Sequence, residues 1–180
     1  MTLDQQALNR DQMPRLFALL DAELAAVDAE GEVYLVGGAV MCLALDARPS
    51  TADVDAYFRP TALVREAAHR VAAKAGIAEH WLNDAVKGFL SPHGEFDPFL
   101  DLPNLRVFTA RPEYLLAMKS ASMRLGEEFH DLDDVRYLLR YLNLTSAVEA
   151  LELVTRYFEE SQLLPKTKLV LEELLPQREA

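Results

Sequence analysis

Two glycines followed by two aspartates one residue apart are the part of this sequence best suited to chemistry. Gly37 and Gly38 end an apolar run, and Asp53 and Asp55 belong to the stretch TADVDAYF. Glycines let backbone N–H groups approach a ligand closely, because they carry no Cβ. Carboxylates are ligands that Mg²⁺ prefers, alongside the phosphate oxygens of a substrate. The pattern predicts a site in which the turn, with the start of the following helix, holds phosphates and the aspartates hold a metal.

A second group of candidate residues lies in the later half of the chain. Asp131 and Asp134 are three residues apart on an expected helix, so their side chains share a face. Lys119 lies on the preceding expected helix, and a turn at Gly126 should make the two helices antiparallel. We expect one of these carboxylates to reach the Lys119 ammonium group. We also expect this lysine to lie in the same cleft as the first aspartate pair and to bind a phosphate.

The hydrophobic pattern predicts the elements that position the first group. Residues 32–38 indicate a short buried strand that ends in the glycine turn. Residues 51–58 alternate as a strand, which puts both aspartates on one face. Further elements are expected as helices over 13–27, 39–47 and 61–75 and a strand over 105–110. Val27 belongs to the apolar face of the first helix, and Thr61 is expected to cap the third, which ends before Gly76.

From Arg111 onward the pattern predicts helices only, with Pro112 suited to a first helical position. These helices are expected over 112–125, 127–143, 145–160 and 166–174. The stretch between residues 77 and 104 is rich in turn residues and gives no assignment. The predicted fold class is α/β in the α+β sense: a small mixed sheet flanked by helices in residues 1–110, with an α-helical region in residues 111–180 packed on it.

Composition limits the classes of function. Of the 180 residues, 51% are apolar and the net charge is −11. This acidity argues against broad binding to DNA or other nucleic acid backbones, although a local basic pocket remains compatible with it. No apolar run is long enough to span a membrane, the start lacks a signal-peptide pattern, and Cys42 is the lone cysteine. We therefore expect a cytoplasmic protein without disulfides.

The order of these motifs resembles the nucleotidyltransferase (polymerase-beta-like) superfamily. Its signature is Gly-Gly or Gly-Ser, a spacer, and Asp-x-Asp on a strand; here the spacer is residues 39–52. The stretch RPSTADVD resembles the Arg-x-x-Thr-x-Asp-x-Asp form of the branch that contains AbiEii-type toxins and small bacterial predicted nucleotidyltransferases. Three later stretches continue the resemblance: WLNDAVKGF at 81–89, LLAMK at 115–119 and Asp-x-x-Asp at 131–134.

The resemblance implies transfer of a nucleotidyl group from an NTP to an unknown acceptor, RNA or protein, with Mg²⁺ or Mn²⁺ as cofactor. It implies that the two strand aspartates bind the metal. Gly37, Gly38, Arg48 and Thr51 would bind the nucleotide. Asp131 or Asp134 would position or deprotonate the acceptor hydroxyl, beside a phosphate-binding lysine. Such proteins often belong to a toxin–antitoxin or phage-defence pair, which implies a cognate toxin or antitoxin partner.

The same residues could instead have purely structural roles. The two glycines also suit a structural turn, the aspartates a solvated strand face, and Asp131 and Asp134 the first turn of a helix. Active superfamily members often use a third carboxylate on a later strand, and no acid interrupts LRVFTA (105–110). Glu95, Asp97 or Asp101 could serve instead, as could the Asp131–Asp134 pair. A non-catalytic antitoxin or protein-interaction module on the same fold is the alternative function.

Overall fold

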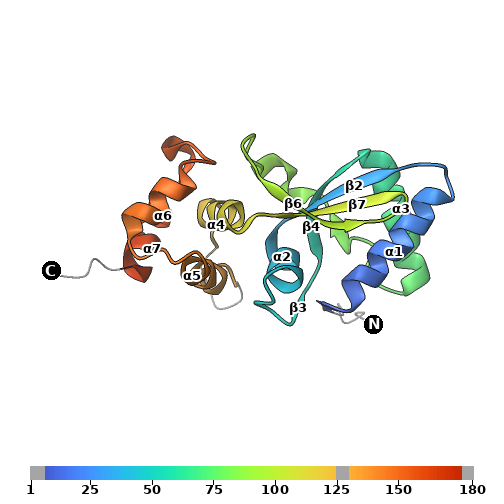
Figure 1. Cartoon of the computed structure of the whole chain (residues 1–180), viewed down its shortest axis with the longest axis horizontal. Helices are drawn as coiled ribbons and strands as arrows, with labels where there is room; N and C mark the ends of the chain where they lie inside the picture. Colours follow the sequence, from blue (N-terminus) through green and yellow to red (C-terminus); the bar gives the residue numbers. More distant parts are fainter. Residues whose placement is uncertain (1–6, 125–129, 176–180) are drawn as a thin grey trace. The chain divides into compact units, whose positions relative to one another are not determined.

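The computed structural model describes residues 7–124 and 130–175. Strands and helices alternate in the first part of the chain, and the described elements after Ala110 are helical (Figure 1). The chain divides into two compact units. One comprises Met1–Gly88 and Phe96–Ala110, and the other comprises Phe89–Glu95 and Arg111–Ala180. The α+β class predicted from the sequence is confirmed.

The first unit is built on a mixed sheet with the strand order β5-β4-β2-β7-β6. Its strands are β2 (Gly31–Leu35), β4 (Val54–Arg59), β5 (Leu82–Asn83), β6 (Phe96–Asp101) and β7 (Leu105–Ala110). Strand β2 runs antiparallel to β4 and parallel to β7, while β4–β5 is parallel and β6–β7 antiparallel. The three strands expected from the sequence therefore lie in one sheet, as predicted.

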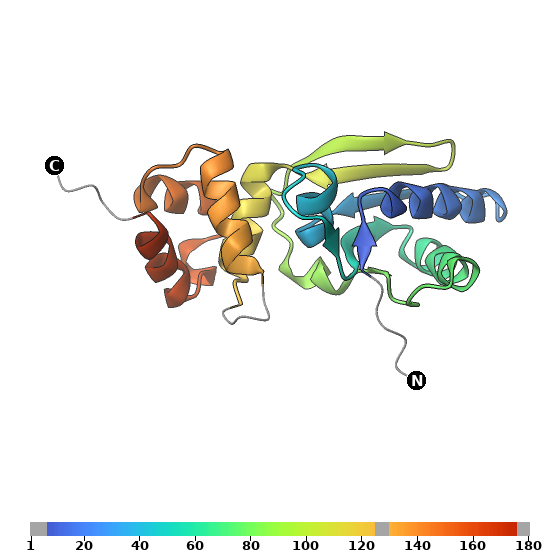
Figure 2. The same ribbon diagram turned by 90° about the horizontal axis from the view of Figure 1, so that it is seen from below.

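Two helices bury one face of this sheet. Helix α1 (Gln12–Ala25) packs beside α3 (Thr61–Ala75), and both contact the strands (Figure 2). Their apolar stripes meet alternate strand residues such as Val33 and Phe58, which are fully buried. Glu23 of α1 is also buried, because Arg70 and Lys74 of α3 bind its carboxylate. These ion pairs hold the pKa of Glu23 below its ordinary value, since they outweigh the effect of burial.

A second, smaller sheet lies beside the glycine turn. It pairs β1 (Leu8–Asn9) antiparallel with β3 (Ser50–Thr51). Helix α2 (Gly37–Leu43) connects β2 to this region and contacts both β3 and β4. Every residue of α2 after its two glycines is buried. The apolar sequence of α2 thus fixes the turn against the strands.

The described helices of the second unit are short and packed through apolar faces. They are α4 (Pro112–Ala121), α5 (Asp131–Tyr141), α6 (Ala147–Val154) and α7 (Pro165–Leu174), with a 3₁₀ turn over Glu160–Gln162. Pro112 and Pro165 begin their helices, where no N–H partner is lost. The Ser146 hydroxyl caps α6 by accepting a hydrogen bond from the Glu149 N–H group.

Residues 89–95 precede β6 but belong to the helical unit. The Ser91 N–H group donates to the Tyr114 hydroxyl over 2.9 Å, and the Ser91 hydroxyl donates to the Tyr157 carbonyl. The Tyr157 hydroxyl in turn donates to Glu95 Oε1 over 2.7 Å. Burial and this carboxylate raise the pKa of Tyr157 well above its ordinary value. Tyrosine hydroxyls therefore attach this segment to the helices.

Several sequence predictions about boundaries were wrong. The strand expected over 51–58 is interrupted by a bend at residues 52–53, so Asp53 precedes β4. Helix α2 begins at Gly37 and ends at Leu43, whereas 39–47 was expected. Val27 lies beyond the end of α1 and is 49% exposed. Thr61 is the first residue of α3, and its hydroxyl donates to the Phe58 carbonyl.

The predicted helix end at Gly76 is confirmed, because Gly76 adopts the left-handed conformation at φ 67°. The helix expected over 145–160 is only α6, and α4 ends at Ala121. The expected turn at Gly126 lies outside the described residues. Among the described residues, no helix is long and apolar enough to cross a bilayer.

The attachment of residues 89–95 gives a testable prediction for Tyr114→Phe. This change leaves the buried Ser91 N–H group without its phenolic acceptor, which costs about 1–3 kcal/mol of unfolding free energy. Urea denaturation followed by circular dichroism measures the loss. Tyr141→Phe, at a half-exposed position on α5, is the matched control and should change stability by less than about 0.5 kcal/mol. Equal effects of the two changes would contradict the account.

Candidate functional site

The glycine turn packs tightly against β4 at Gly37 and against the loop before β4 at Gly38. Val36 is extended, and Gly37 has φ +63°, a conformation that L side chains rarely adopt. A Cβ added to Gly37 would lie 3.3 Å from Asp55 Oδ2. The backbone of the turn therefore lies directly beside a carboxylate of β4.

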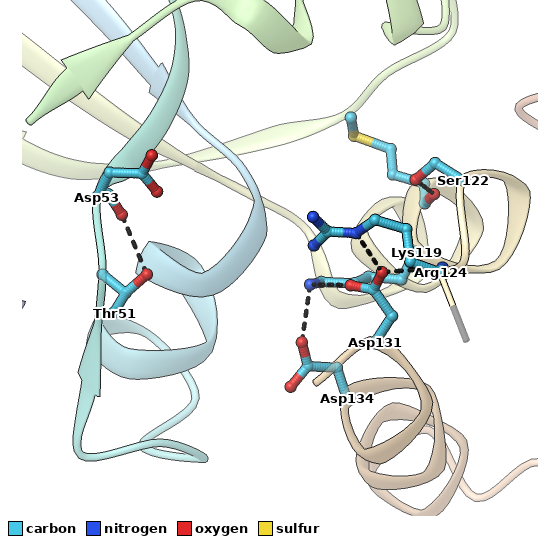
Figure 3. Close-up of polar contacts among 8 residues, drawn as sticks. Thr51, Asp53, Lys119, Ser122, Arg124, Asp131 and Asp134 are labelled. Carbon is cyan, nitrogen blue, oxygen red and sulfur yellow. Dashed lines mark hydrogen bonds and ion pairs between the residues drawn. The ribbon is translucent and has the colours of Figure 1, made fainter. Parts of the chain in front are cut away.

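Gly38 makes the same kind of approach to two other predicted site residues. A Cβ added there would lie 2.7 Å from Thr51 Oγ1 and 3.0 Å from the Arg48 guanidinium. Thr51 is buried, and its hydroxyl donates to the Asp53 carbonyl over 3.0 Å (Figure 3). This hydrogen bond stabilises the bend that precedes β4. The loop from Arg48 to Asp53 and the glycine turn thus form one structural unit.

The two aspartates of the motif lie in different secondary structure. Asp55 lies in β4 between buried Val54 and Ala56, so its side chain is on the opposite, open face of the sheet. Asp53 lies in the bend, and its Oδ2 accepts a hydrogen bond from Asn83 Nδ2 over 3.1 Å. Asn83 is on β5, in register with Asp55. The strand pair β4–β5 therefore orients the Asp53 carboxylate.

The donor set of this site fits Mg²⁺ as a partial ligand set. Mg²⁺ is commonly held by one or two carboxylates, with substrate phosphates and waters completing the octahedron. Asp53 and Asp55 supply the two carboxylates, and the backbone of the glycine turn lies beside the second of them. Within residues 7–124 and 130–175, no three His, Cys, Asp or Glu side chains converge as metal ligands. A metal here would therefore depend on the oxygens of its ligand.

The second predicted group forms a compact ion-pair cluster in the helical unit. Lys119 Nζ lies 3.2 Å from Asp131 Oδ1 and 2.7 Å from Asp134 Oδ2 (Figure 3). The exposed side-chain fractions are 11%, 7% and 4% for these three residues. The predicted contact between the lysine on α4 and the carboxylates of α5 is therefore confirmed. Asp133, on the other side of α5, is exposed and pairs with Arg136 instead.

Arg124 completes this cluster. Its backbone N–H and its guanidinium Nε both donate to Asp131 Oδ2, over 3.0 and 2.9 Å. Burial opposes the ionisation of Asp131, but Arg124 and Lys119 outweigh burial and hold the pKa of this carboxyl below its ordinary value of 3.8. Within the described part of the chain, Lys119 and Arg124 thus face the two carboxylates of α5.

The sequence prediction thus found the members of two groups. Gly37, Gly38, Arg48 and Thr51 come together beside Asp55, and Lys119 lies between Asp131 and Asp134. That the two groups serve one cleft stays a prediction. The carboxylates considered as a third ligand have other settings: Glu95 binds Tyr157 and Arg111, while Asp97 and Asp101 lie on β6.

Two neighbours of these groups escaped sequence reasoning. Asn83 belongs to a strand of two residues, which is too short to give a periodic signal, although it lies within the WLNDAVKGF stretch. Arg124 follows the end of α4, and its partner Asp131 is seven residues away on another helix. Neither contact follows from spacing along the chain.

None of the family models, curated proteins or solved structures that were compared with this chain matches it.

The packing at Gly38 predicts that Gly38→Ala is harmful. Replacing a helical glycine by alanine normally stabilises by about 0.5–1 kcal/mol, but here the new Cβ displaces the Thr51 hydroxyl and costs about 1–3 kcal/mol. Gly88→Ala is the matched control, because a Cβ there has nothing within 4 Å. Thermal unfolding should show a lower midpoint for Gly38→Ala only. A Gly38→Ala protein as stable as the control would contradict the close approach.

The burial of the ion-pair cluster changes the expectation for Lys119→Ala. The sequence alone predicts little change in melting temperature, as for a lysine at a cleft surface. In the structure, the change leaves two buried carboxylates without their shared cation, which costs about 3–5 kcal/mol. Urea denaturation should show this loss for Lys119→Ala and almost none for Lys168→Ala, an exposed lysine on α7. Similar midpoints for both variants would show that the cluster contributes little to stability.

Proposed function

We propose that this chain is a nucleotidyltransferase that transfers a nucleotidyl group from an NTP to a hydroxyl of an acceptor, RNA or protein, and releases pyrophosphate. The observation that carries the proposal is the approach of the Gly37–Gly38 turn to Asp55, Thr51 and Arg48. A purely structural turn has no need to bring bare backbone next to a carboxylate, a hydroxyl and a guanidinium at once. These are the groups that a metal–triphosphate requires.

The proposed roles follow from the chemistry of each group. The backbone N–H groups of Gly37 and Gly38 would donate to phosphate oxygens, as successive backbone amides of a glycine turn do in anion-binding sites. Arg48 would pair with a phosphate through its planar guanidinium. Thr51 would hold the bend in which Asp53 lies, through its hydrogen bond to the Asp53 carbonyl. Helix α2 is too short to supply a strong helix dipole, so the turn itself has to carry the phosphate binding.

Asp53 and Asp55 would hold Mg²⁺, with Mn²⁺ as a substitute. The bound ion would neutralise the charge that develops on the triphosphate. In the transfer, the acceptor oxygen forms a bond to the α-phosphorus as the bond from this phosphorus to the pyrophosphate oxygen breaks. The acceptor proton passes to a carboxylate. Asn83 would act as a positioning residue, since its amide donates to Asp53.

The resemblance to the superfamily also assigns Lys119, Asp131 and Asp134 to the transfer, as a phosphate-binding lysine and as carboxylates that orient the acceptor. Lys119 would have to exchange at least one of its two carboxylate partners for a phosphate in order to act in this way. Its activity test needs a variant that keeps the charge, such as Lys119→Arg, since loss of the charge destabilises the unit. In the cell, we propose a cytoplasmic role in a toxin–antitoxin or phage-defence pair.

A non-catalytic interaction module, such as an antitoxin, is the second candidate. It is favoured by the absence of a third converging acid among the described residues and by the two carboxylates that Lys119 already binds. Such a module needs no affinity for a metal–nucleotide complex. Nucleotide binding therefore separates the two functions.

The proposed function predicts that Asp53→Ala with Asp55→Ala abolishes Mg²⁺-dependent NTP binding. Both aspartates are half-buried, so their removal should change the free energy of unfolding by only about 0.5 kcal/mol. Isothermal titration calorimetry with each Mg–NTP measures the binding. Asp133→Ala, an exposed aspartate on α5, is the control and should bind as the unmodified protein does. Unchanged affinity in the double variant would remove the site, and no affinity in the unmodified protein would favour the interaction module.

A further inference from the structure

Asn83 lies beside both aspartates of the candidate metal site. It is in register with Asp55 on the parallel strand β5, and its Nδ2 donates to Asp53 Oδ2 over 3.1 Å. Residues in register on neighbouring strands are about 4.8 Å apart and share a face of the sheet. The pair before them, Leu82 and Val54, is buried on the helix-covered face, so Asn83 shares the open face with Asp55. Three oxygen-bearing side chains therefore converge here, and the third is an amide.

The orientation of this amide is fixed by the backbone. Asn83 Oδ1 accepts a hydrogen bond from the Ala85 N–H group over 3.3 Å. A backbone N–H group can only donate, so it faces the amide oxygen and turns the NH₂ end toward Asp53. Asn83 therefore presents Asp53 with a hydrogen-bond donor that carries no charge.

The neighbours of Asn83 hold it in this place. Trp81 is 1% exposed, its indole N–H group donates to the backbone of α3, and its carbonyl accepts from the Val54 N–H group over 2.7 Å. Asp84, the next residue, binds Arg65 of α3 over 2.7 Å. The acid of this stretch thus pairs with an arginine of the covering helix, and the neutral residue lies beside the two aspartates.

We propose that Asn83 is a specificity-determining residue that makes metal binding at this site depend on a nucleotide. The inference rests on the proposed function, because it concerns the same two aspartates. Mg²⁺ requires six oxygen ligands and gives up its waters reluctantly, so two carboxylates alone bind it weakly. An acid at position 83 would add a third charged ligand. Because the amide does not, phosphate oxygens have to complete the ligand set.

The charges of the groups lead to the same conclusion. Asp53 and Asp55 together balance one divalent cation. A third carboxylate would leave a surplus negative charge next to the triphosphate, and it would repel Asp53 at contact distance. The neutral amide avoids both effects. The site therefore favours a metal–nucleotide complex over the bare cation.

The test compares bare Mn²⁺ with Mn–NTP on the full chain. Electron paramagnetic resonance of free Mn²⁺ measures the affinity without nucleotide, and titration calorimetry measures the affinity for each Mn–NTP. We expect the unmodified protein to bind Mn–NTP at least tenfold more tightly than Mn²⁺. Asn83→Asp should bind bare Mn²⁺ at least tenfold more tightly than the unmodified protein does, without a gain toward Mn–NTP. Asn83→Ala should lose about tenfold in affinity for Mn–NTP and gain none for bare Mn²⁺.

Asn143→Asp is the matched control, because it adds the same charge at an exposed position in the other unit. Asn143 has φ 54°, a conformation that aspartate also adopts, so this variant should fold and bind as the unmodified protein does. A role of Asn83 in structure alone would make Asn83→Asp and Asn83→Ala equal toward bare Mn²⁺.

That equality in folded variants would overturn the inference. Unmodified protein that binds bare Mn²⁺ as tightly as Mn–NTP would also overturn it, and this measurement needs no variant. The proposed function fails separately, if the unmodified protein binds no Mn–NTP. In that case, a gain of Mn²⁺ affinity in Asn83→Asp still supports the exclusion of the bare cation by Asn83.

Discussion

The close approach of the Gly37–Gly38 backbone to the start of β4 is the constraint on which the candidate site depends. Gly37 adopts a positive φ, and a Cβ would be crowded by Asp55 at Gly37 and by Thr51 and Arg48 at Gly38. The buried helix α2 keeps the turn in this place, and the Thr51 hydrogen bond fixes the bend at Asp53. The backbone of the turn, a guanidinium and the Asp55 carboxylate thereby lie close together. We propose that this combination, with Asp53, binds a metal–nucleotide complex.

Ion pairs neutralise buried acids in both units of the chain. Buried acids are paired throughout: Glu23 with Arg70 and Lys74, and Asp131 with Lys119 and Arg124. Removing one partner of such a pair is costly, because the remaining charge stays in a poorly solvated place. Asp53 differs from these acids, since its carboxylate accepts a hydrogen bond from the neutral amide of Asn83.

The sequence predicted what depends on local pattern. The hydrophobic pattern identified β2, β4 and β7, a glycine after the apolar stripe of α3 identified the end of that helix, and spacing put Asp131 and Asp134 on the same side of α5. What failed depends on tertiary pairing. The bend at Asp53 separates β3, which pairs with β1, from β4 in the larger sheet. The two-residue strand that carries Asn83 forms only through its pairing with β4. Lys119 is likewise buried by contacts between α4 and α5, so the sequence of α4 alone does not predict its burial.

Paramagnetic relaxation would show whether the glycine turn and the aspartates bind a metal–nucleotide complex. Trace Mn²⁺ in place of Mg²⁺ broadens the amide NMR signals of nearby residues, so it locates a metal–nucleotide complex on the folded chain. If the turn and the aspartates bind it, the amide signals of Gly37, Gly38, Asp53 and Asp55 should broaden when NTP and trace Mn²⁺ are added together. Excess Mg²⁺ should restore them. The account is contradicted if these four signals stay sharp, or if the broadening is confined to exposed acids such as Asp133 and needs no NTP.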